Sequence, residues 1–255
     1  MEQIFFFLPY VLLNTESENT SFDAQSSIYQ FDGSISNRGI LMTEIPRITY
    51  LGQSGFYIET SDIKLVIDPQ NKKAGNLEGN LVYSTHKHFD HTGGVKTFLT
   101  RNPDAILLGN EQVTGKFSQF GDRVKKVSDG ELFEFKSLTF SFKRLEHGIW
   151  TSVYNLAVEI HIGDFTFAHC GDAVSFDSFP SSSIDVLAIP IGGAFAASPK
   201  KALEMILNLS KPLPTIVPMH WLMRNPESFC KKLRDEIPDV NCIVPSDGEL
   251  LMGHE

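Results

Sequence analysis

The sequence predicts a layered α/β protein in which mixed β-sheets are flanked by helices. Segments typical of strands come first along the chain, and strands then alternate with helical patterns, as layered α/β proteins require. Apolar residues make up 42% of the 255 residues, which is enough for a large core. Residues 47–255 contain no segment with the composition of a linker. We therefore expect one domain over residues 47–255 and an N-terminal extension over residues 1–46.

The extension contains a ten-residue apolar run, Ile4–Leu13. This run is too short to cross a bilayer and is interrupted by Pro9. The basic residues that open a secretion signal do not precede it, because the only early charge is Glu2. We expect a segment that packs on the core or on another subunit, rather than a signal or stable membrane insertion. The polar stretch after Leu13 predicts a loop.

The first strands begin at Arg47. Alternating apolar, β-branched and aromatic residues, separated by Gly-containing or polar turns, predict them. In chain order the strand patterns are RITYLG, GFYIET, SDIKLVIDP and NLVYST. The third ends at Asp68 and Pro69, and the fourth leads directly into a histidine-rich segment. A short helix is then expected from Gly93 or Gly94 to a point before Pro103.

The second half continues with strands and two capped helices. The strand patterns are AILLG, ELFEF, LTFSFKRLEHG, VYNLAVEIHIGD, FTFAHCGD, IDVLAIPI and TIVPMH, with NCIV and ELLM as closing strands. Ser198 and Pro199 suit the N-cap and first residue of one helix, and Asn225 and Pro226 suit those of another. Apolar residues recur at helical spacing after both caps.

Charge and cysteine usage exclude some classes of partner and location. The formal net charge of −9 repels phosphate backbones, so we expect no nucleic-acid partner. A small anionic substrate stays open, because a bound metal reverses the local field. The three cysteines are odd in number, widely spaced and free of any CxxC pair, which argues against a disulfide framework or a cysteine-only zinc site. A reducing, cytoplasmic location is therefore expected.

The segment STHKHFDHTGG carries an H-x-H-x-D-H pattern, formed by His86, His88, Asp90 and His91. Side chains two apart in an extended segment project to the same side, so His86 and His88 can reach one ion together. Asp90 and His91 are adjacent, so a turn must direct them to a second point. A hydrogen-bonded core or surface role explains one histidine well, but it explains four ligand-type residues in six positions poorly. The pattern predicts metal binding.

Three more ligand-type residues each follow a predicted strand, namely His147, Asp172 and His220. Two ions with three ligands each require two groups. The groups are His86, His88 and His147 on one side, and Asp90, His91 and His220 on the other. Asp172 has two oxygens and can bridge the two ions. Two cations that share a carboxylate and a water lower the pKa of that water and leave a hydroxide at neutral pH.

This ordered set resembles the metallo-β-lactamase superfamily from about Arg47 to the C-terminus. The resemblance implies an αββα sandwich with the metals at one edge, and it implies that Asp68 supports the ligands from behind. LGQSGFYIE, LAIPIGGAF and VPMHW are similar to a branch of single-domain hydrolases that includes ascorbate-6-phosphate lactonase. We expect two divalent ions, zinc first and manganese or iron as alternatives, and cleavage of an ester, lactone or phosphodiester of a small substrate. Asp90 is expected to help hold the nucleophile or handle its proton.

Several aromatic residues flank the expected ligands. Trp150, Phe195 and Trp221 either line a substrate pocket or serve as packing. Two further functions stay open for the same ligands, a di-iron redox protein and a metal-holding module without catalysis. The apolar N-terminal run also leaves a homo-oligomer open.

Overall fold

The computed structural model describes residues 45–148, 152–176, 178–180 and 183–253. Nearly all of the predicted extension, including the run Ile4–Leu13, lies outside the described residues, and so does Trp150. The first strand begins at Arg47. The division into an extension of residues 1–46 and a domain of residues 47–255 stays a prediction.

Two mixed β-sheets form the centre of the domain, as predicted. The first has seven strands in the order β13 (Leu250–Met252), β1 (Arg47–Gly52), β2 (Gly55–Glu59), β3 (Lys64–Ile67), β4 (Leu81–Ser84), β5 (Ile106–Gly109) and β6 (Val124–Lys126). The second has six in the order β12 (Thr215–Met219), β11 (Val186–Pro190), β10 (Phe165–His169), β9 (Asn155–Ile162), β8 (Leu138–Leu145) and β7 (Leu132–Phe135). Antiparallel pairs give way to parallel pairs at β3–β4 in the first sheet and at β10–β11 in the second.

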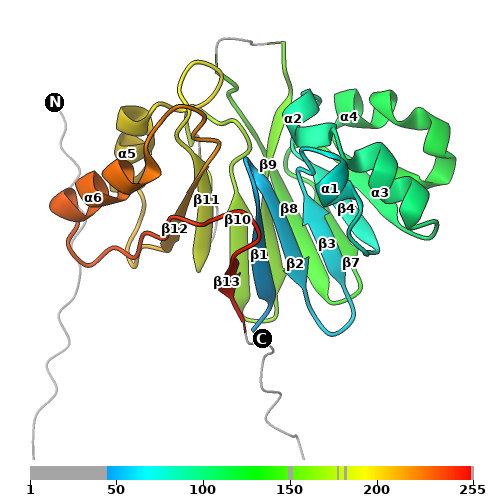
Figure 1. Cartoon of the computed structure of the whole chain (residues 1–255), viewed down its shortest axis with the longest axis horizontal. Coiled ribbons are helices and arrows are strands. Elements are labelled where there is room, and N and C mark those ends of the chain that lie inside the picture. The colour runs from blue at the N-terminus through cyan, green and yellow to red at the C-terminus, as the bar shows by residue number, and fades with distance from the viewer. Residues whose placement is uncertain (1–44, 149–151, 177, 181–182, 254–255) are drawn as a thin grey trace, which may run out of the picture. The chain divides into compact units, whose positions relative to one another are not determined.

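Helices lie on the outer side of each sheet (Figure 1). The helices beside the first sheet are α1 (Lys72–Gly75), α2 (Phe89–Thr92), α3 (Val95–Arg101) and α4 (Glu111–Lys116), followed by a 3₁₀ segment (Ser118–Arg123). Those beside the second are α5 (Pro199–Leu207) and α6 (Pro226–Glu236). The predicted caps form, because Ser198 and Asn225 accept hydrogen bonds from the backbone N–H groups of Lys201 and Ser228. None of the helices in the described part has the length and apolar character needed to cross a bilayer.

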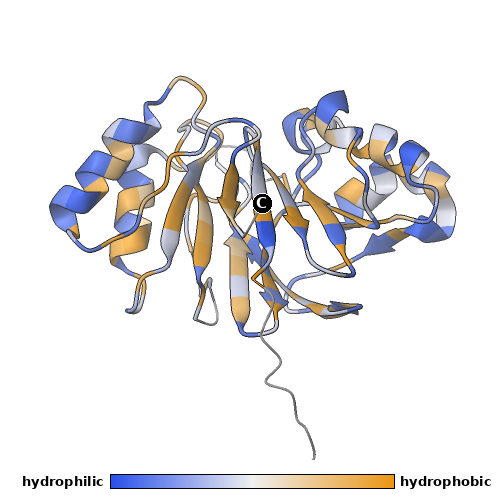
Figure 2. Cartoon of the chain, turned by 60° about the horizontal axis from the view of Figure 1, so that its bottom comes forward, coloured by the Kyte–Doolittle hydropathy of each residue, from blue (hydrophilic) through white to orange (hydrophobic). Residues whose placement is uncertain are grey.

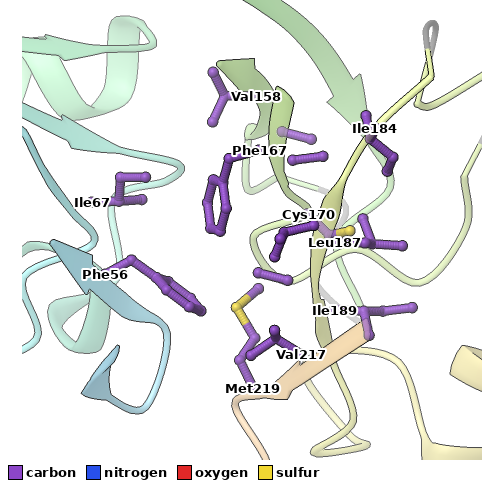
Figure 3. Close-up of a cluster of buried hydrophobic side chains, with 14 of the residues drawn as sticks. Phe56, Ile67, Val158, Phe167, Cys170, Ile184, Leu187, Ile189, Val217 and Met219 are labelled. Atoms are coloured by element: carbon purple, nitrogen blue, oxygen red, sulfur yellow. The ribbon is translucent and has the colours of Figure 1, made fainter. Parts of the chain in front are cut away.

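The αββα layering follows from where the apolar side chains lie. Strands carry most of the strongly hydrophobic residues, and the helices turn hydrophilic residues outward (Figure 2). One core fills the space between the sheets, where Phe56 of β2 meets Phe167 of β10 with ring centroids 5.2 Å apart (Figure 3). A second core packs α3 and α4 against the first sheet through residues such as Phe98 and Val113. The predicted fold class is therefore confirmed.

The structure corrects two details of the sequence prediction. Residues 241–244 form no closing strand, because only Cys242 makes a bridge, to Ile216 of β12. Cys230 and Cys242 form a disulfide, although cysteine spacing argued against disulfides. The reason is that α6 packs on β12 and residue 242 pairs with the same strand, so the two cysteines meet across a turn. Cys170 is buried and free.

Candidate metal centre

The seven predicted ligands meet where four strands end. The segment after β4 supplies the first four, two from the bends at residues 85–88 and two from α2. The other three come from the second sheet, since His147 follows β8, Asp172 follows β10 and His220 follows β12. The site therefore joins loops from both sheets. All seven are at least partly buried, and the Asp90 side chain keeps 43% of its surface exposed.

Four of these side chains form a first group, His86, His88, His147 and Asp172, whose ligand atoms lie within 4.8 Å of one another. His86 Nε2 is 3.0 Å from His88 Nδ1 and 3.7 Å from Asp172 Oδ2. His147 Nε2 is 3.6 Å from the same oxygen. Two nitrogens bound to one zinc ion at about 2.1 Å lie about 3.4 Å apart in tetrahedral geometry. These separations fit a shared cation.

Asp90, His91 and His220 form a second group, within the same 4.8 Å limit. His220 Nε2 is 3.1 Å and His91 Nε2 is 3.6 Å from Asp90 Oδ2. Asp172 also reaches this group, because its Oδ1 is 3.4 Å from His91 Nε2 and its Oδ2 is 3.4 Å from His220 Nε2. One carboxylate thus lies within reach of both groups.

Unpartnered buried atoms test whether this donor set fits a metal. Asp172 Oδ1, His91 Nε2 and His147 Nε2 are buried and have no hydrogen-bond partner among the described residues. A buried polar atom without a partner is costly to the folded state. All three atoms belong to the two groups and have lone pairs available to a cation. The residues present therefore fit metal ions.

Asp68 supports the ligands from behind the centre. Its carboxylate accepts hydrogen bonds from the backbone N–H and hydroxyl of Thr85, each at 2.8 Å, and from His91 Nδ1 at 2.7 Å. The Thr85 oxygen then accepts from His86 Nδ1 at 3.0 Å. With Nδ1 protonated in both rings, the Nε2 lone pairs of His86 and His91 are left for a metal. Asp68 adopts the left-handed conformation (φ 44°), so the backbone is held in an uncommon state to place this carboxylate.

Burial sets the protonation state of the first group. Burial lowers the pKa of His86 well below its ordinary value, and the neighbouring histidines His91 and His147 lower it further. The pKa values of His88 and His147 are also lowered, chiefly by burial, although Asp172 opposes the shift. Neutral imidazoles are the form that binds metals. This half of the centre is therefore ready to bind a cation near neutral pH.

In the second group, neighbouring carboxylates determine the direction in which the histidine pKa values shift. Burial alone would lower the pKa of His91, but the carboxylates of Asp172 and Asp68 outweigh it and raise that pKa well above its ordinary value. The pKa of His220 is raised in the same way by Asp172 and Asp90. The pKa values of Asp90 and Asp172 are lowered despite burial, by the hydrogen bond from His220 to Asp90 and by His91 next to Asp172. A cation in this group would replace protons as the partner of these carboxylates.

Gln53 is a contact of the centre that the sequence did not single out. It lies in the turn between β1 and β2, and its side-chain amide donates to Asp90 Oδ2 at 3.2 Å. Its backbone carbonyl accepts from the N–H of His220 at 2.7 Å and from the hydroxyl of Tyr50 at 2.9 Å. The glycines around Gln53 predicted only a turn. No local signal could show that this turn packs against the end of β12.

Asn155 shapes the turn that presents Asp172. Its side chain donates to the carbonyl of Cys170 at 3.0 Å and accepts from the N–H of Asp172 at 3.1 Å. Gly171 between them has φ 56°, and a Cβ there would lie 2.1 Å from the Asn155 oxygen. Only glycine fits this turn. In the Gly171–Asp172 pair, the glycine therefore allows the turn and the aspartate is the candidate ligand.

A cavity of about 390 Å³ opens beside the two groups. It is lined by His88, Phe89, Asp90, Asp172, Phe195, His220 and Leu222. Phe195 thus lies where a pocket residue was expected. Trp221 instead packs its ring against Tyr50, with centroids 5.6 Å apart, and is absent from the cavity lining. The chain adopts left-handed conformations at His220 and Leu222, on either side of Trp221, and Leu222 lines the cavity.

Comparisons with known proteins show which family the chain resembles. A model described as a β-lactamase superfamily domain matches residues 47–220. A UPF0173 protein of Pyrococcus abyssi is 31% identical over 180 residues, which cover 69% of this chain and 83% of that protein. A protein of Aeropyrum pernix named UPF0173 metal-dependent hydrolase is 29% identical over 236 residues, which cover 80% of this chain and 96% of that protein.

Solved structures share the fold at low sequence identity. Igni18, a metallo hydrolase from Ignicoccus hospitalis, has a TM-score of 0.70 and 20% identity, with 83% of this chain and 100% of that chain covered. CmlA, a diiron β-hydroxylase from Streptomyces venezuelae, has a TM-score of 0.64 and 12% identity, with 82% of this chain and 54% of that chain covered. These structures support the fold alone. Because the family model spans most of the domain, the chain belongs to the metallo-β-lactamase superfamily, and it is similar over most of its length to proteins named metal-dependent hydrolases.

Proposed function

We propose that the protein is a metal-dependent hydrolase with a two-metal centre. In this proposal His86, His88 and His147 hold one ion, Asp90, His91 and His220 hold the other, and Asp172 binds both. One observation carries it, namely that Asp172 lies within 3.4–3.7 Å of histidine nitrogens from each group. The hydrolase names of the similar proteins support the reaction class.

Divalent ions held by these residues would supply Lewis-acid chemistry, namely activation of water as a nucleophile and polarisation of the scissile group. The chain's own residues supply orientation and proton handling. Asp68 and Thr85 fix the tautomers of His86 and His91. Asp90 lines the cavity and is half exposed, so its carboxylate is placed to orient the attacking water or to accept a proton from it.

Zinc is the proposed ion, with manganese or iron as alternatives. The donor set is five imidazoles and two carboxylates, a mixture that all three metals accept. For the substrate we propose a small ester or lactone first, because of the resemblance to the ascorbate-6-phosphate lactonase branch, and a phosphodiester second. The cytoplasmic location, the absence of a nucleic-acid partner and the homo-oligomer stay predictions. The Cys230–Cys242 disulfide bears on location, because disulfides seldom persist in reducing compartments.

Elemental analysis paired with a hydrolase panel tests the proposal. The full chain, purified without an affinity tag, is expected to hold close to two equivalents of metal and to hydrolyse at least one lactone, ester, thioester or phosphodiester. His88→Ala and Asp172→Ala are expected to lose metal and activity together. His161→Ala is a matched control, because His161 lies on β9 outside both groups. Full metal content and full activity in both centre variants would refute the two-metal hydrolase.

A di-iron redox function is the second candidate. The chain shares its fold with the diiron enzyme CmlA, and imidazole and carboxylate ligands also suit iron. Tightly bound iron, a visible spectrum that changes with dioxygen, and silence across the hydrolase panel would select this candidate. Colourless zinc protein with hydrolase activity would select the first.

A further inference from the structure

The cavity beside the centre has two kinds of wall. His88, Asp90, Asp172 and His220 belong to the candidate metal centre, so these residues would hold the ions and face the reacting group on that side. The remaining wall consists of Phe89, Phe195 and Leu222. The part of a substrate that extends away from the scissile bond therefore meets apolar side chains.

These apolar side chains are unusually exposed. Phe89 is 74% exposed, Leu222 52% and Phe195 36%. Scattered exposed hydrophobics are normal on protein surfaces, but a group of them around one opening marks a binding site. The next residue, Met223, is also exposed, at 99%.

The backbone at Leu222 gives independent evidence. Its φ of 50° lies in the left-handed region, where glycine or asparagine is favoured and a leucine is uncommon. Burial does not explain the leucine either, because half of its surface is exposed. Uncommon backbone conformations at a site point to a functional constraint. Packing and backbone preference do not explain a leucine here, whereas contact with a ligand does.

Phe195 is held in place by a close backbone approach. Gly148 follows the candidate ligand His147, and a Cβ on Gly148 would lie 2.4 Å from the carbonyl oxygen of Phe195. Glycine thus lets the loop after β8 pack directly on the backbone of Phe195. The backbone of Phe195 therefore packs directly beside the segment that carries the candidate ligand His147.

Basic side chains are missing from the described part of this wall. No lysine or arginine is among the described residues that line the cavity. The nearby Arg224 donates Nε to the carbonyl of Gly192 at 3.3 Å, and Lys116 donates Nζ to Thr92 Oγ1 at 2.6 Å. A phosphate or carboxylate remote from the scissile bond would meet phenyl and aliphatic surface, which solvates charge poorly.

Resting on the proposed hydrolase function, we propose that the substrate is an uncharged carboxylic ester or lactone whose alkyl or aryl group lies against Phe89, Phe195 and Leu222. Hydrolysis adds the oxygen of water to the carbonyl carbon and breaks the acyl carbon–oxygen bond. The leaving alkoxide takes one proton of the water and the other is released. An ester then gives a carboxylate and an alcohol, and a lactone gives a single hydroxycarboxylate, with no change of oxidation state.

A homologous series of substrates tests this proposal on the full chain loaded with zinc or manganese. The series runs from γ-butyrolactone through γ-hexalactone and γ-octalactone to γ-decalactone, with a phosphate-bearing sugar lactone and bis(p-nitrophenyl) phosphate as charged comparators. Burying one methylene contributes up to about fourfold in kcat/KM, and we expect such a rise over the first few methylenes. A flat or falling series, or preference for a charged comparator, would overturn the proposal while leaving the hydrolase function intact. Silence on every substrate with two equivalents of metal bound would instead refute the hydrolase function.

Leu222→Asn separates a substrate contact from a structural role. Asparagine suits the left-handed backbone, so the melting temperature is expected to be equal or higher. The factor by which kcat/KM rises with each added methylene is expected to fall toward one in this variant, mainly because KM rises for the longer lactones. Leu207→Asn makes the same change at a 48% exposed leucine of α5 outside the cavity, and it is expected to keep the wild-type series. An unchanged series in Leu222→Asn would remove Leu222 from the site.

Discussion

The Nδ1 atom of His91 lies 2.7 Å from Asp68 Oδ2, and both side chains are fully buried. This contact decides which nitrogen of His91 faces Asp90 and Asp172. Through Thr85 the same carboxylate also orients His86, so one residue that touches no candidate metal position controls one histidine in each group.

Asp68→Asn is therefore expected to weaken metal binding at both positions. The amide would set a donor against the Nδ1 proton of His91 or force that ring into the other tautomer. Loss of such outer support typically reduces metal affinity about 10–100-fold. Competition against a chromogenic chelator measures both affinities. Asp164→Asn, in the exposed turn between β9 and β10, is the matched control, and an affinity equal to that control would contradict this role for Asp68.

Gln53→Leu is expected to affect one metal position more than the other. The variant removes the donor to Asp90, which belongs only to the second group. Since Asp90 is partly exposed, the loss is about 1 kcal/mol, or roughly fivefold in affinity. Metal titration should show weakening of one of the two equivalents and a nearly unchanged affinity for the other. Equal weakening of both equivalents would indicate a general disturbance of the β1–β2 turn instead.

Reduction of the Cys230–Cys242 disulfide is expected to lower stability and leave the metal centre intact. The bond closes a loop of 12 residues in sequence separation, for which the entropic contribution is about 2–3 kcal/mol. In a domain of this size the melting temperature should fall by about 5–10 °C. Thermal unfolding with and without reductant measures the shift, and metal content is measured on the same samples. Release of metal on reduction would show that α6 supports the centre more directly than its contacts with β12 suggest.

His169→Gln is expected to reduce the acid sensitivity of the metal-free protein. His169 is fully buried, donates Nε2 to the carbonyl of Ser54 at 2.9 Å and accepts at Nδ1 from the N–H of Gly171. Burial lowers its pKa in the folded state, so below about pH 6.5 the unfolded chain binds a proton that the folded chain refuses. The folded state therefore loses stability from this residue as the pH falls, by at most about 1.4 kcal/mol per pH unit.

The glutamine amide can donate to the carbonyl of Ser54 as Nε2 of His169 does, and it does not titrate. Urea unfolding in the presence of a chelator, at pH 7 and pH 5, compares the two proteins without any contribution from metal release. The drop in unfolding free energy between these pH values should be smaller in the variant. An equal drop in both proteins would mean that His169 does not contribute to acid sensitivity.

Much of the site could be predicted because its ligands follow strands, and strands leave a periodic pattern. His147, Asp172 and His220 each come directly after such a pattern, so the shared edge could be foreseen. The contribution of Gln53 could not, because it depends on a turn of the first sheet packing against the end of β12 in the second. Trp221 and Leu222 differ by one position, and the sequence pattern does not show that Leu222 lines the cavity while Trp221 packs against Tyr50. The pairing of Cys230 with Cys242 likewise depends on both lying against the same strand.

The candidate ligands divide between the sheets, with four on the loop and helix after β4 and three at the ends of β8, β10 and β12. Ions bound there would cross-link two layers that are also joined at this edge by hydrogen bonds, such as those from the N–H of His220 to the carbonyl of Gln53 and from His169 to the carbonyl of Ser54. Because the ions bind only the closed sandwich, their binding free energy adds to the free energy needed to open it. A protein built in this way loses its protection from proteases when its surroundings are starved of metal, so its abundance in the cell would report on metal supply.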